Sequence, residues 1–256
     1  MRNTDTNMPV KKKTKAPGQG MTAKQMKRRK PISQDYMLPI EPLTDNQKVM
    51  FDAWDEGKMI YAYGVAGTGK TFVALYKALK EVLDDYSPYE KIYIVRSLVA
   101  TREIGFLPGD HEDKSSLYQI PYKNMVQAMF EMPDDNSYEM LYDNLKAQET
   151  ISFWSTSFIR GTTLDNSIVI IDECQNLNFH ELDSIITRVG QDSKIIFCGD
   201  AAQTDLQKIS ERTGIIDFQR ILQNMEEFSM IEFGIDDIVR SGLVRSYLIN
   251  KINLGL

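Results

Sequence analysis

An octapeptide in the first third of the chain has the residue types and spacing of a phosphate-binding loop. Residues 64–71 read Gly-Val-Ala-Gly-Thr-Gly-Lys-Thr and fit the pattern G-x-x-x-x-G-K-[ST] at every fixed position. The glycines let the backbone wrap around a phosphate and direct successive N–H groups at it. The pattern assigns Lys70 to the β- and γ-phosphates of a nucleotide and the hydroxyl of Thr71 to Mg²⁺. We expect nucleotide contacts along the whole loop, from Gly64, Val65, Ala66, Gly67, Thr68, Gly69, Lys70 and Thr71.

The residues on either side of this loop match the context that the motif requires. Residues 59–63 have the pattern of a short buried strand, and Phe72 to Leu83 carry apolar residues at helical spacing. The alternative, a chance glycine-rich turn, does not predict a strand before the loop and a helix after it. The new helix would add the positive end of its dipole to the phosphate site.

Two adjacent carboxylates follow an apolar run later in the chain. Ile168 to Ile171 are all apolar and are followed by Asp172 and Glu173. The run predicts a central strand that delivers both acids to the carboxyl edge of the sheet, where ligands of open α/β sheets bind. We expect Asp172 to hold Mg²⁺ beside Thr71 and Glu173 to act as general base on the attacking water. The alternative is a pair of acids at the start of a loop.

Another apolar strand, residues 194–198, ends in Gly199 and Asp200 and is followed by Gln203. A strand beside the phosphate loop can place a polar side chain against the γ-phosphate, and Gln203 fits the role of a sensor there. Asp200 would orient it or support the metal. Spacing alone leaves open the alternative that these are ordinary turn residues.

The remaining pattern alternates short apolar strands with helices. The predicted strands are residues 59–63, 92–95, 151–154, 168–171, 194–198 and 229–233, and the predicted helices are 44–56, 70–83, 120–131, 136–147, 179–188 and 214–225. This alternation predicts an α/β fold with a mostly parallel central sheet and helices on both faces. Residues 97–118 lack clear periodicity and are expected to form a long loop.

Composition and charge limit the classes of protein. The 256 residues are 42% hydrophobic and 26% charged, and no apolar run reaches the length of a membrane span. With no signal-peptide pattern and only Cys174 and Cys198, we expect a cytoplasmic protein with buried thiols and no zinc site. Ten basic residues and one acid give residues 1–30 a charge of +9, which leaves −15 for the remainder of a chain whose net charge is −6. We predict a flexible basic arm over residues 1–36, which binds nucleic acid or is only a solubilising tail, and one domain over 37–256.

Several phrases together resemble the PhoH-like ATPase family and, more distantly, the first RecA-like domain of superfamily 1 helicases. They are GVAGTGKT at 64–71, GFLPGD at 105–110, RGTTLDNSIVIIDECQNL at 160–177, TRVG at 187–190, KIIFCGDAAQTDL at 194–206 and DDIVRSGLV at 236–244. The match covers about residues 38–250. The resemblance implies a RecA-like P-loop NTPase fold and ATP hydrolysis, with Mg²⁺, coupled to single-stranded RNA or DNA.

The resemblance also assigns roles to single residues. Gln47 matches a glutamine that reads the adenine ring, although Thr44 and Gln47 also form a capping-box pattern. Gln203 is similar to the helicase glutamine that couples the γ-phosphate to nucleic acid. Arg240 resembles an arginine that neutralises the transferring phosphoryl group, with a surface ion pair to Asp236 or Asp237 as the alternative. Arg188 is a second candidate for that role.

Nucleic-acid contacts are expected where helicases grip a strand, at the residues that follow the second and third strands. The candidates are Arg96, Thr101, Arg102 and Arg160. Because a single RecA-like domain is expected, we predict a homo-oligomer, a hexamer, in which Arg240 completes a neighbour's site. We expect no nuclease activity and no membrane contact. One alternative function is an ATP-dependent switch that acts on a protein partner without moving along a strand. Another is a small-molecule kinase, against which Glu173 after Asp172 and the helicase-like Gln203 argue.

Overall fold

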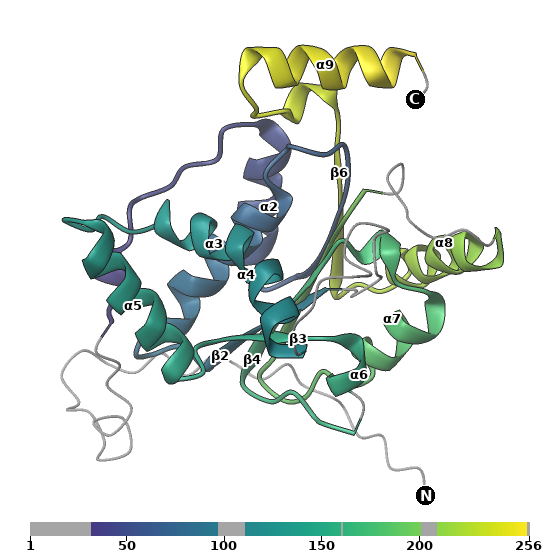
Figure 1. The fold of residues 1–256 in the computed structure, drawn as a ribbon. Helices are drawn as coiled ribbons and strands as arrows, with labels where there is room; N and C mark the ends of the chain where they lie inside the picture. Colours follow the sequence, from purple (N-terminus) through teal and green to yellow (C-terminus); the bar gives the residue numbers. More distant parts are fainter. Residues whose placement is uncertain (1–31, 97–110, 160, 201–208, 255–256) are drawn as a thin grey trace, which may run out of the picture.

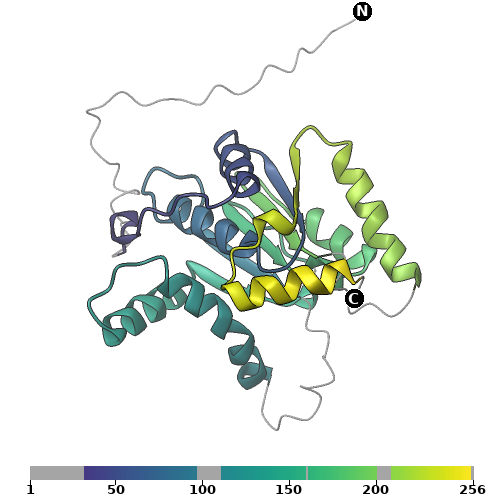
Figure 2. The same cartoon turned by 90° about the horizontal axis from the view of Figure 1, so that it is seen from above.

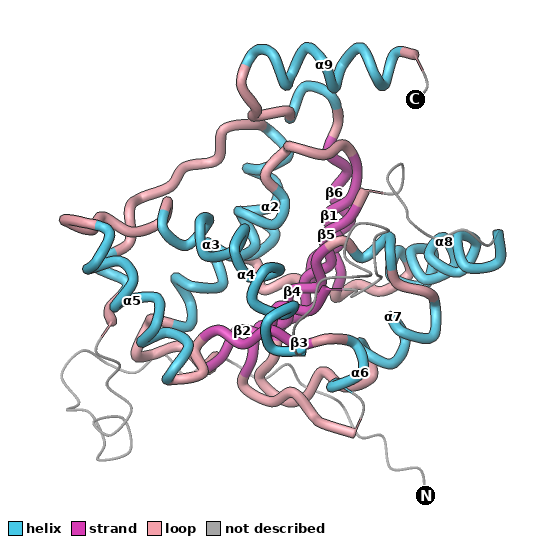
Figure 3. The backbone as a smooth tube through the Cα atoms, in the orientation of Figure 1, coloured by secondary structure: helices cyan, strands magenta, loops and turns pink. Residues whose placement is uncertain are grey.

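A six-stranded parallel sheet forms the centre of the computed structural model. The structure describes residues 32–96, 111–159, 161–200 and 209–254, with the backbone alone for 111–118, 157–158 and 209–213. The strands are β1 (Met59–Gly64), β2 (Lys91–Arg96), β3 (Ile151–Trp154), β4 (Ser167–Asp172), β5 (Lys194–Gly199) and β6 (Phe228–Phe233). They lie in the order β3-β2-β4-β5-β1-β6, and Figure 3 shows helices on either side of them. All six predicted strands are confirmed.

The described helices, apart from the last one, divide between the two faces of the sheet (Figure 1). They are α2 (Asp45–Asp55), α3 (Lys70–Val82), α4 (His111–Gln127), α5 (Asp135–Ala147), α6 (Thr156–Ile159), α7 (Phe179–Ile186), α8 (Ile209–Gln223) and α9 (Gly242–Asn253), with short 3₁₀ turns at Gln34–Tyr36, Cys174–Asn176 and Ile235–Asp237. Helices α2 to α5 pack on one face and α6 to α8 on the other, and Figure 2 shows α8 opposite α4 and α5.

Alternation along each strand explains why both faces are covered. Ile168 and Ile170 of β4 belong to the core under α2 to α5, whereas Val169 and Ile171 belong to the core under α6 to α8. Every residue of β4 is buried, as is every residue of β5. Because successive side chains of a strand point to opposite faces, a strand buried on both is apolar along its middle, and the polar Ser167, Asp172 and Lys194 stand at strand ends. The predicted doubly covered sheet is therefore confirmed.

The helix that contributes Tyr122 to the site begins earlier than predicted. We expected residues 97–118 to form a loop and residues 120–131 a helix, but α4 runs from His111 to Gln127. The sequence conceals this helix because Pro121 lies inside it and its apolar residues do not line up on one face. Residues 97–110 lie outside the described part of the chain.

The two ends of the chain also differ from the prediction. Ile32 is buried in the core and residues 34–36 form a 3₁₀ turn, so packing begins before the predicted arm boundary at residue 36. The predicted arm over residues 1–31 lies outside the described residues. Helix α9 was not predicted, and it buries none of its residues against the described part of the chain (Figure 1). Within the described residues, no helix has the length and apolar character needed to span a membrane.

Candidate nucleotide site

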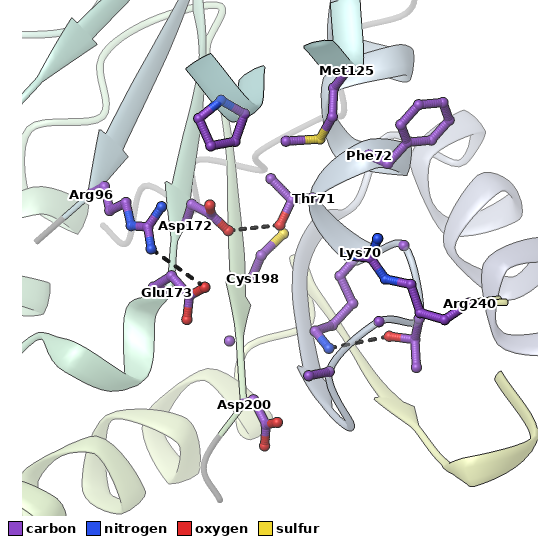
Figure 4. Close-up of a pocket in the computed structure, with 16 residues that line it drawn as sticks. Lys70, Thr71, Phe72, Arg96, Met125, Asp172, Glu173, Cys198, Asp200 and Arg240 are labelled. Carbon is purple, nitrogen blue, oxygen red and sulfur yellow. Dashed lines mark hydrogen bonds and ion pairs between the residues drawn. The ribbon is translucent and has the colours of Figure 1, made fainter. Parts of the chain in front are cut away.

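Four adjacent strands deliver the predicted site residues to one edge of the sheet. Arg96 ends β2, Asp172 ends β4, Gly199 ends β5 and Gly64 ends β1, and these strands are neighbours in the order β2-β4-β5-β1. Their ends surround a cavity of about 320 Å³ (Figure 4). It is lined by Ala66, Gly67, Thr68, Gly69, Lys70, Thr71, Phe72, Arg96, Pro121, Met125, Asp172, Glu173, Cys198, Gly199, Asp200 and Arg240. The parallel topology therefore brings the loop and the two carboxylates together.

The phosphate loop is a tight turn that crosses the end of β6. A Cβ on Gly64 would lie 2.2 Å from the carbonyl oxygen of Phe233, so only glycine fits there. Inside the loop the hydroxyl of the buried Thr68 donates to the carbonyl of Val65 at 2.9 Å. Helix α3 then begins at Lys70 and directs its amino end at the loop.

Lys70 is held by the loop that it follows. Its ammonium donates to the carbonyl oxygens of Gly64 and Val65, at 3.0 and 2.7 Å, and to the hydroxyl of Thr68 at 3.2 Å. These contacts use all three of its donors. Burial lowers the pKa of Lys70, and nearby groups that include Asp200 and Glu173 oppose this shift. A phosphate in the loop would replace carbonyl acceptors with a stronger, charged one.

Asp172 joins the loop to β4 and α4. Its Oδ1 accepts from the hydroxyl of Thr71 at 2.6 Å, and its Oδ2 accepts from the hydroxyl of Tyr122 at 2.5 Å. Tyr122 is 2% exposed and Asp172 is 8% exposed. Burial, together with the charge of Asp172, raises the pKa of Tyr122, so the phenol stays protonated and continues to donate. The Thr71–Asp172 pair predicted from the sequence is thus brought together by the fold, and Tyr122 fixes its orientation.

Glu173 is held from two sides. Its Oε2 accepts from the side-chain amide of Gln175 at 2.5 Å, and its Oε1 lies 3.7 Å from the guanidinium of Arg96. Gln175 is 1% exposed, and its own oxygen accepts from the backbone N–H of Asp200 at 2.9 Å. Glu173 has a φ of 52°, a left-handed conformation that few non-glycine residues adopt. Gln175 therefore connects the predicted general base to the end of β5.

Gln47 braces the loop and borders a second cavity. Its backbone N–H donates to the hydroxyl of Thr44 at 3.3 Å, as a helix cap predicts, but its side-chain oxygen accepts from Leu43 and not from Thr44. Its side-chain amide donates to the carbonyl of Thr68 at 2.9 Å. The second cavity, of about 310 Å³, is lined by Ile40, Glu41, Leu43, Gln47, Gly67, Gly69, Phe72, Val73, Met125, Val239 and Arg240. The two cavities share five lining residues and therefore lie side by side along the loop, and we call the two together the cleft.

Arg240 lies on the phosphate loop of its own chain. A Cβ on Gly67 would come within 2.9 Å of Arg240 Cγ, and the N–H of Val239 donates to the carbonyl of Gly67 at 3.1 Å. We expected Arg240 to complete a neighbouring subunit's site, but the segment after β6 folds back and places it over the same chain's loop. No ion pair of Arg240 with Asp236 or Asp237 is seen among the described residues. Arg188 lies outside both cavities.

Other predicted residues lie outside the described part of the chain. They are Gln203, Thr101, Arg102 and Arg160. Of the predicted nucleic-acid contacts, Arg96 is described, and it lines the cavity beside Glu173. Tyr122 and Gln175 were not predicted. Gln175 lies two residues after Glu173 and could have been suspected, whereas no local signal connects Tyr122 with Asp172.

The chain matches known proteins over most of its length. A profile of the family described as PhoH-like protein matches residues 39–250. A PhoH-like protein of Mycobacterium leprae is 32% identical over 206 residues, which cover 80% of this chain and 56% of that protein. A PhoH-like protein of Bacillus subtilis is 32% identical over 210 residues, covering 78% and 60% of the two chains. Protein PhoH of Escherichia coli is 28% identical over 212 residues, covering 82% and 57%. The chain thus matches somewhat more than half the length of these relatives.

Solved structures resemble the chain more distantly. The large terminase of a thermophilic bacteriophage, in complex with ADP, has 14% identity and a TM-score of 0.47, and the match covers 80% of this chain and 49% of the terminase. The Pif1 helicase of Candida albicans has 17% identity and a TM-score of 0.37, with 76% and 40% covered. At this distance the similarity carries no information on activity.

The phosphate loop after β1 and the acidic pair after β4, on a parallel sheet with helices on both faces, make up the predicted RecA-like P-loop NTPase fold. The family profile covers both motifs and the cleft between them. The chain belongs to the PhoH-like family.

Proposed function

We propose that this chain binds ATP with Mg²⁺ and hydrolyses it, and that hydrolysis is coupled to single-stranded RNA or DNA. The observation that carries the proposal is the 2.6 Å hydrogen bond between Thr71 and Asp172, with Glu173 in the same cavity. This contact unites the end of the phosphate loop with the carboxyl end of β4. A site that only held a phosphate would not need the second carboxylate.

The residues of the cavity fit Mg²⁺ and a triphosphate. Thr71 and Asp172 supply hard oxygen ligands, and Mg²⁺ usually combines one or two such groups with waters and substrate phosphates. Within the described residues, no group of three or more His, Cys, Asp or Glu side chains could hold a metal alone. The phosphate oxygens of a bound nucleotide would supply further ligands, and Mg²⁺ would neutralise charge that develops on them.

Glu173 is the residue that we assign to the attacking water. In the proposed reaction the water oxygen bonds to the terminal phosphorus, the bond from phosphorus to the bridging oxygen breaks, and Glu173 accepts the water proton. Lys70 and Arg240 lie on the loop side of the cleft, where they would contact the phosphates. Gln203 is proposed to sense the terminal phosphate by its resemblance to the helicase glutamine.

The second cavity suits the base and the ribose. Ile40, Leu43 and Phe72 give it an apolar wall, and it adjoins the phosphate loop at Gly67 and Gly69. Gln47 lines this cavity, and we propose that its side chain contacts the adenine ring. Its bonds to Leu43 and Thr68 add a second role, because they hold the base side of the cleft in register with the loop.

A nucleotide-dependent switch that acts on a protein partner is the second candidate function. Helix α9 favours it, because it begins directly after Arg240 and Ser241 and exposes the apolar side chains of Leu243 and Tyr247, with Leu254 just beyond its end. The exposed fractions of these three residues are 84%, 64% and 72%. Exposed apolar side chains that gather into one surface patch are typical of interaction sites. The same surface would form subunit contacts in the proposed homo-oligomer, a hexamer. The two functions differ in the partner of α9, which is another protein in the switch and a second copy of this chain in the homo-oligomer.

Phosphate release from ATP by the purified chain, measured with and without single-stranded RNA or DNA, tests the proposal. We expect Mg²⁺-dependent hydrolysis that increases severalfold with nucleic acid, because movement along a strand requires contacts that change with the nucleotide state. Hydrolysis that is indifferent to nucleic acid would favour the protein switch. Absence of hydrolysis under every condition would reject the proposed activity.

Tyr122→Phe is expected to raise the Mg²⁺ concentration needed for half-maximal ATP hydrolysis by about tenfold, because the variant loses the donor to Asp172 Oδ2. Packing should persist, since the ring contact with Phe153 at 5.3 Å needs no hydroxyl. Tyr142→Phe is the matched control, because the Tyr142 hydroxyl is buried without a hydrogen-bond partner in the described structure. An unchanged Mg²⁺ requirement in Tyr122→Phe would refute the orienting role.

A further inference from the structure

The carboxylate of Glu173 has one fixed partner and one exchangeable partner. Gln175 is fixed, because it is 1% exposed and also accepts from the N–H of Asp200. A Cβ on Gly199 would lie 2.8 Å from the oxygen of Gln175, so the backbone leaves just enough room for this amide. Arg96 is a looser partner at 3.7 Å, and the exposed fractions of the Arg96 and Glu173 side chains are 34% and 39%. An ion pair this exposed is weak and can be replaced by a better ligand.

Arg96 lies on the side of the cleft opposite the phosphate loop. Figure 4 shows it beside Glu173, with Thr71 and Asp172 between it and Lys70. Burial lowers the pKa of Arg96, but the neighbouring Tyr122, Asp172 and Glu173 raise it by more, so the guanidinium stays charged. Lys70 and Arg240 belong to the loop side, so Arg96 is the cation of the opposite side within the described lining.

From this arrangement we infer that Arg96 is a positioning residue. When a triphosphate is bound, Arg96 leaves Glu173 and contacts the terminal phosphate instead. The inference rests on the proposed function, because Glu173 must lie next to the terminal phosphate if it activates the attacking water. Arg96 is then within reach of that phosphate too. Phosphate carries more charge than a carboxylate and accepts two parallel N–H bonds from a guanidinium, so it should win the competition.

The exchange would prepare Glu173 for its task. Once Arg96 turns to the phosphate, Oε1 of Glu173 loses its cation and is available to a water proton. Gln175 still holds Oε2, so the orientation of the carboxylate is retained. With a diphosphate in the cleft no terminal phosphate is present, and Arg96 stays on Glu173. The exchange therefore makes the availability of Glu173 as a base depend on an intact triphosphate.

Nucleotide binding tests this without any measurement of turnover. Affinities for ADP and for a non-hydrolysable ATP analogue, both with Mg²⁺, are compared in the unmodified chain, Arg96→Gln, Glu173→Gln and the double variant. Arg96→Gln keeps a side-chain N–H donor and loses the charge, so we expect about tenfold weaker binding of the analogue and ADP affinity within about twofold. Glu173→Gln removes the competing carboxylate, so we expect severalfold tighter binding of the analogue alone. The double variant should show no such gain.

Arg220→Gln is the matched control, because Arg220 also pairs with an exposed carboxylate, Asp217 at 3.3 Å, but lies on α8. Should Arg96→Gln fail to fold, Arg96→Lys and the Glu173→Gln comparison still measure the exchange. Equal losses for ADP and the analogue, or additive effects in the double variant, would overturn the inference. So would a loss of single-stranded DNA binding with an unchanged preference for the analogue, which would make Arg96 a nucleic-acid contact. If the unmodified chain binds neither nucleotide, the proposed function itself fails.

Discussion

Glu173→Gln is expected to lower the rate of ATP hydrolysis by about 10²–10⁴-fold while ATP binding is retained. Glutamine has the shape of glutamate and can still accept the hydrogen bond from Gln175, but its amide cannot take a proton from water. Asp172, Thr71 and Lys70 are untouched, so the phosphate and metal contacts persist. The result would separate hydrolysis from binding at a single atom position.

The measurement is single-turnover phosphate release beside equilibrium binding of a fluorescent ATP analogue. Glu139→Gln is the matched control, because Glu139 is also a carboxylate in an exposed ion pair, with Lys123, and joins α5 to α4 outside the cleft. Its hydrolysis rate should stay within about twofold of the unmodified chain. A Glu173→Gln variant that hydrolysed ATP at more than about a tenth of the normal rate would exclude Glu173 as the base.

Lys70→Met is expected to weaken ATP binding by about 10²-fold or more. Methionine keeps the apolar stem in the tight space beside Phe233, whose ring lies 5.7 Å from the ammonium, and removes three donors. Those donors now bond the carbonyls of Gly64 and Val65 and the hydroxyl of Thr68. On nucleotide binding they would turn to phosphate oxygens, so the variant loses both the charge and the donors.

The check is titration with the fluorescent analogue, with thermal unfolding to confirm that the loop variant is folded. Lys80→Met serves as control, because Lys80 lies on the exposed side of the same helix. Binding by Lys70→Met within about threefold of the unmodified chain would show that the phosphates bind elsewhere.

Residues close together in the sequence allowed the most reliable predictions. A strand buried on both faces is apolar between its ends, so runs such as Ile168–Ile171 identify it without any tertiary information. The phosphate loop is likewise local, since its glycines and Lys70 lie within one octapeptide. The predictions that failed concern two helices without a clear apolar pattern in the sequence. Helix α4 was hidden by Pro121, and α9 makes no core contact in the described structure that would impose an apolar pattern on it.

The candidate site shows the same division. The sequence by itself determined the family, the loop and the acidic pair, because each is a short pattern whose chemistry depends on neighbours along the chain. Only the tertiary structure decided which distant side chains hold them. It placed Tyr122 on Asp172, Gln175 between Glu173 and Asp200, and Arg240 on its own chain's loop. Such contacts depend on strand order and on helices that cross the carboxyl edge of the sheet. The spacing of residues along the sequence does not reveal them.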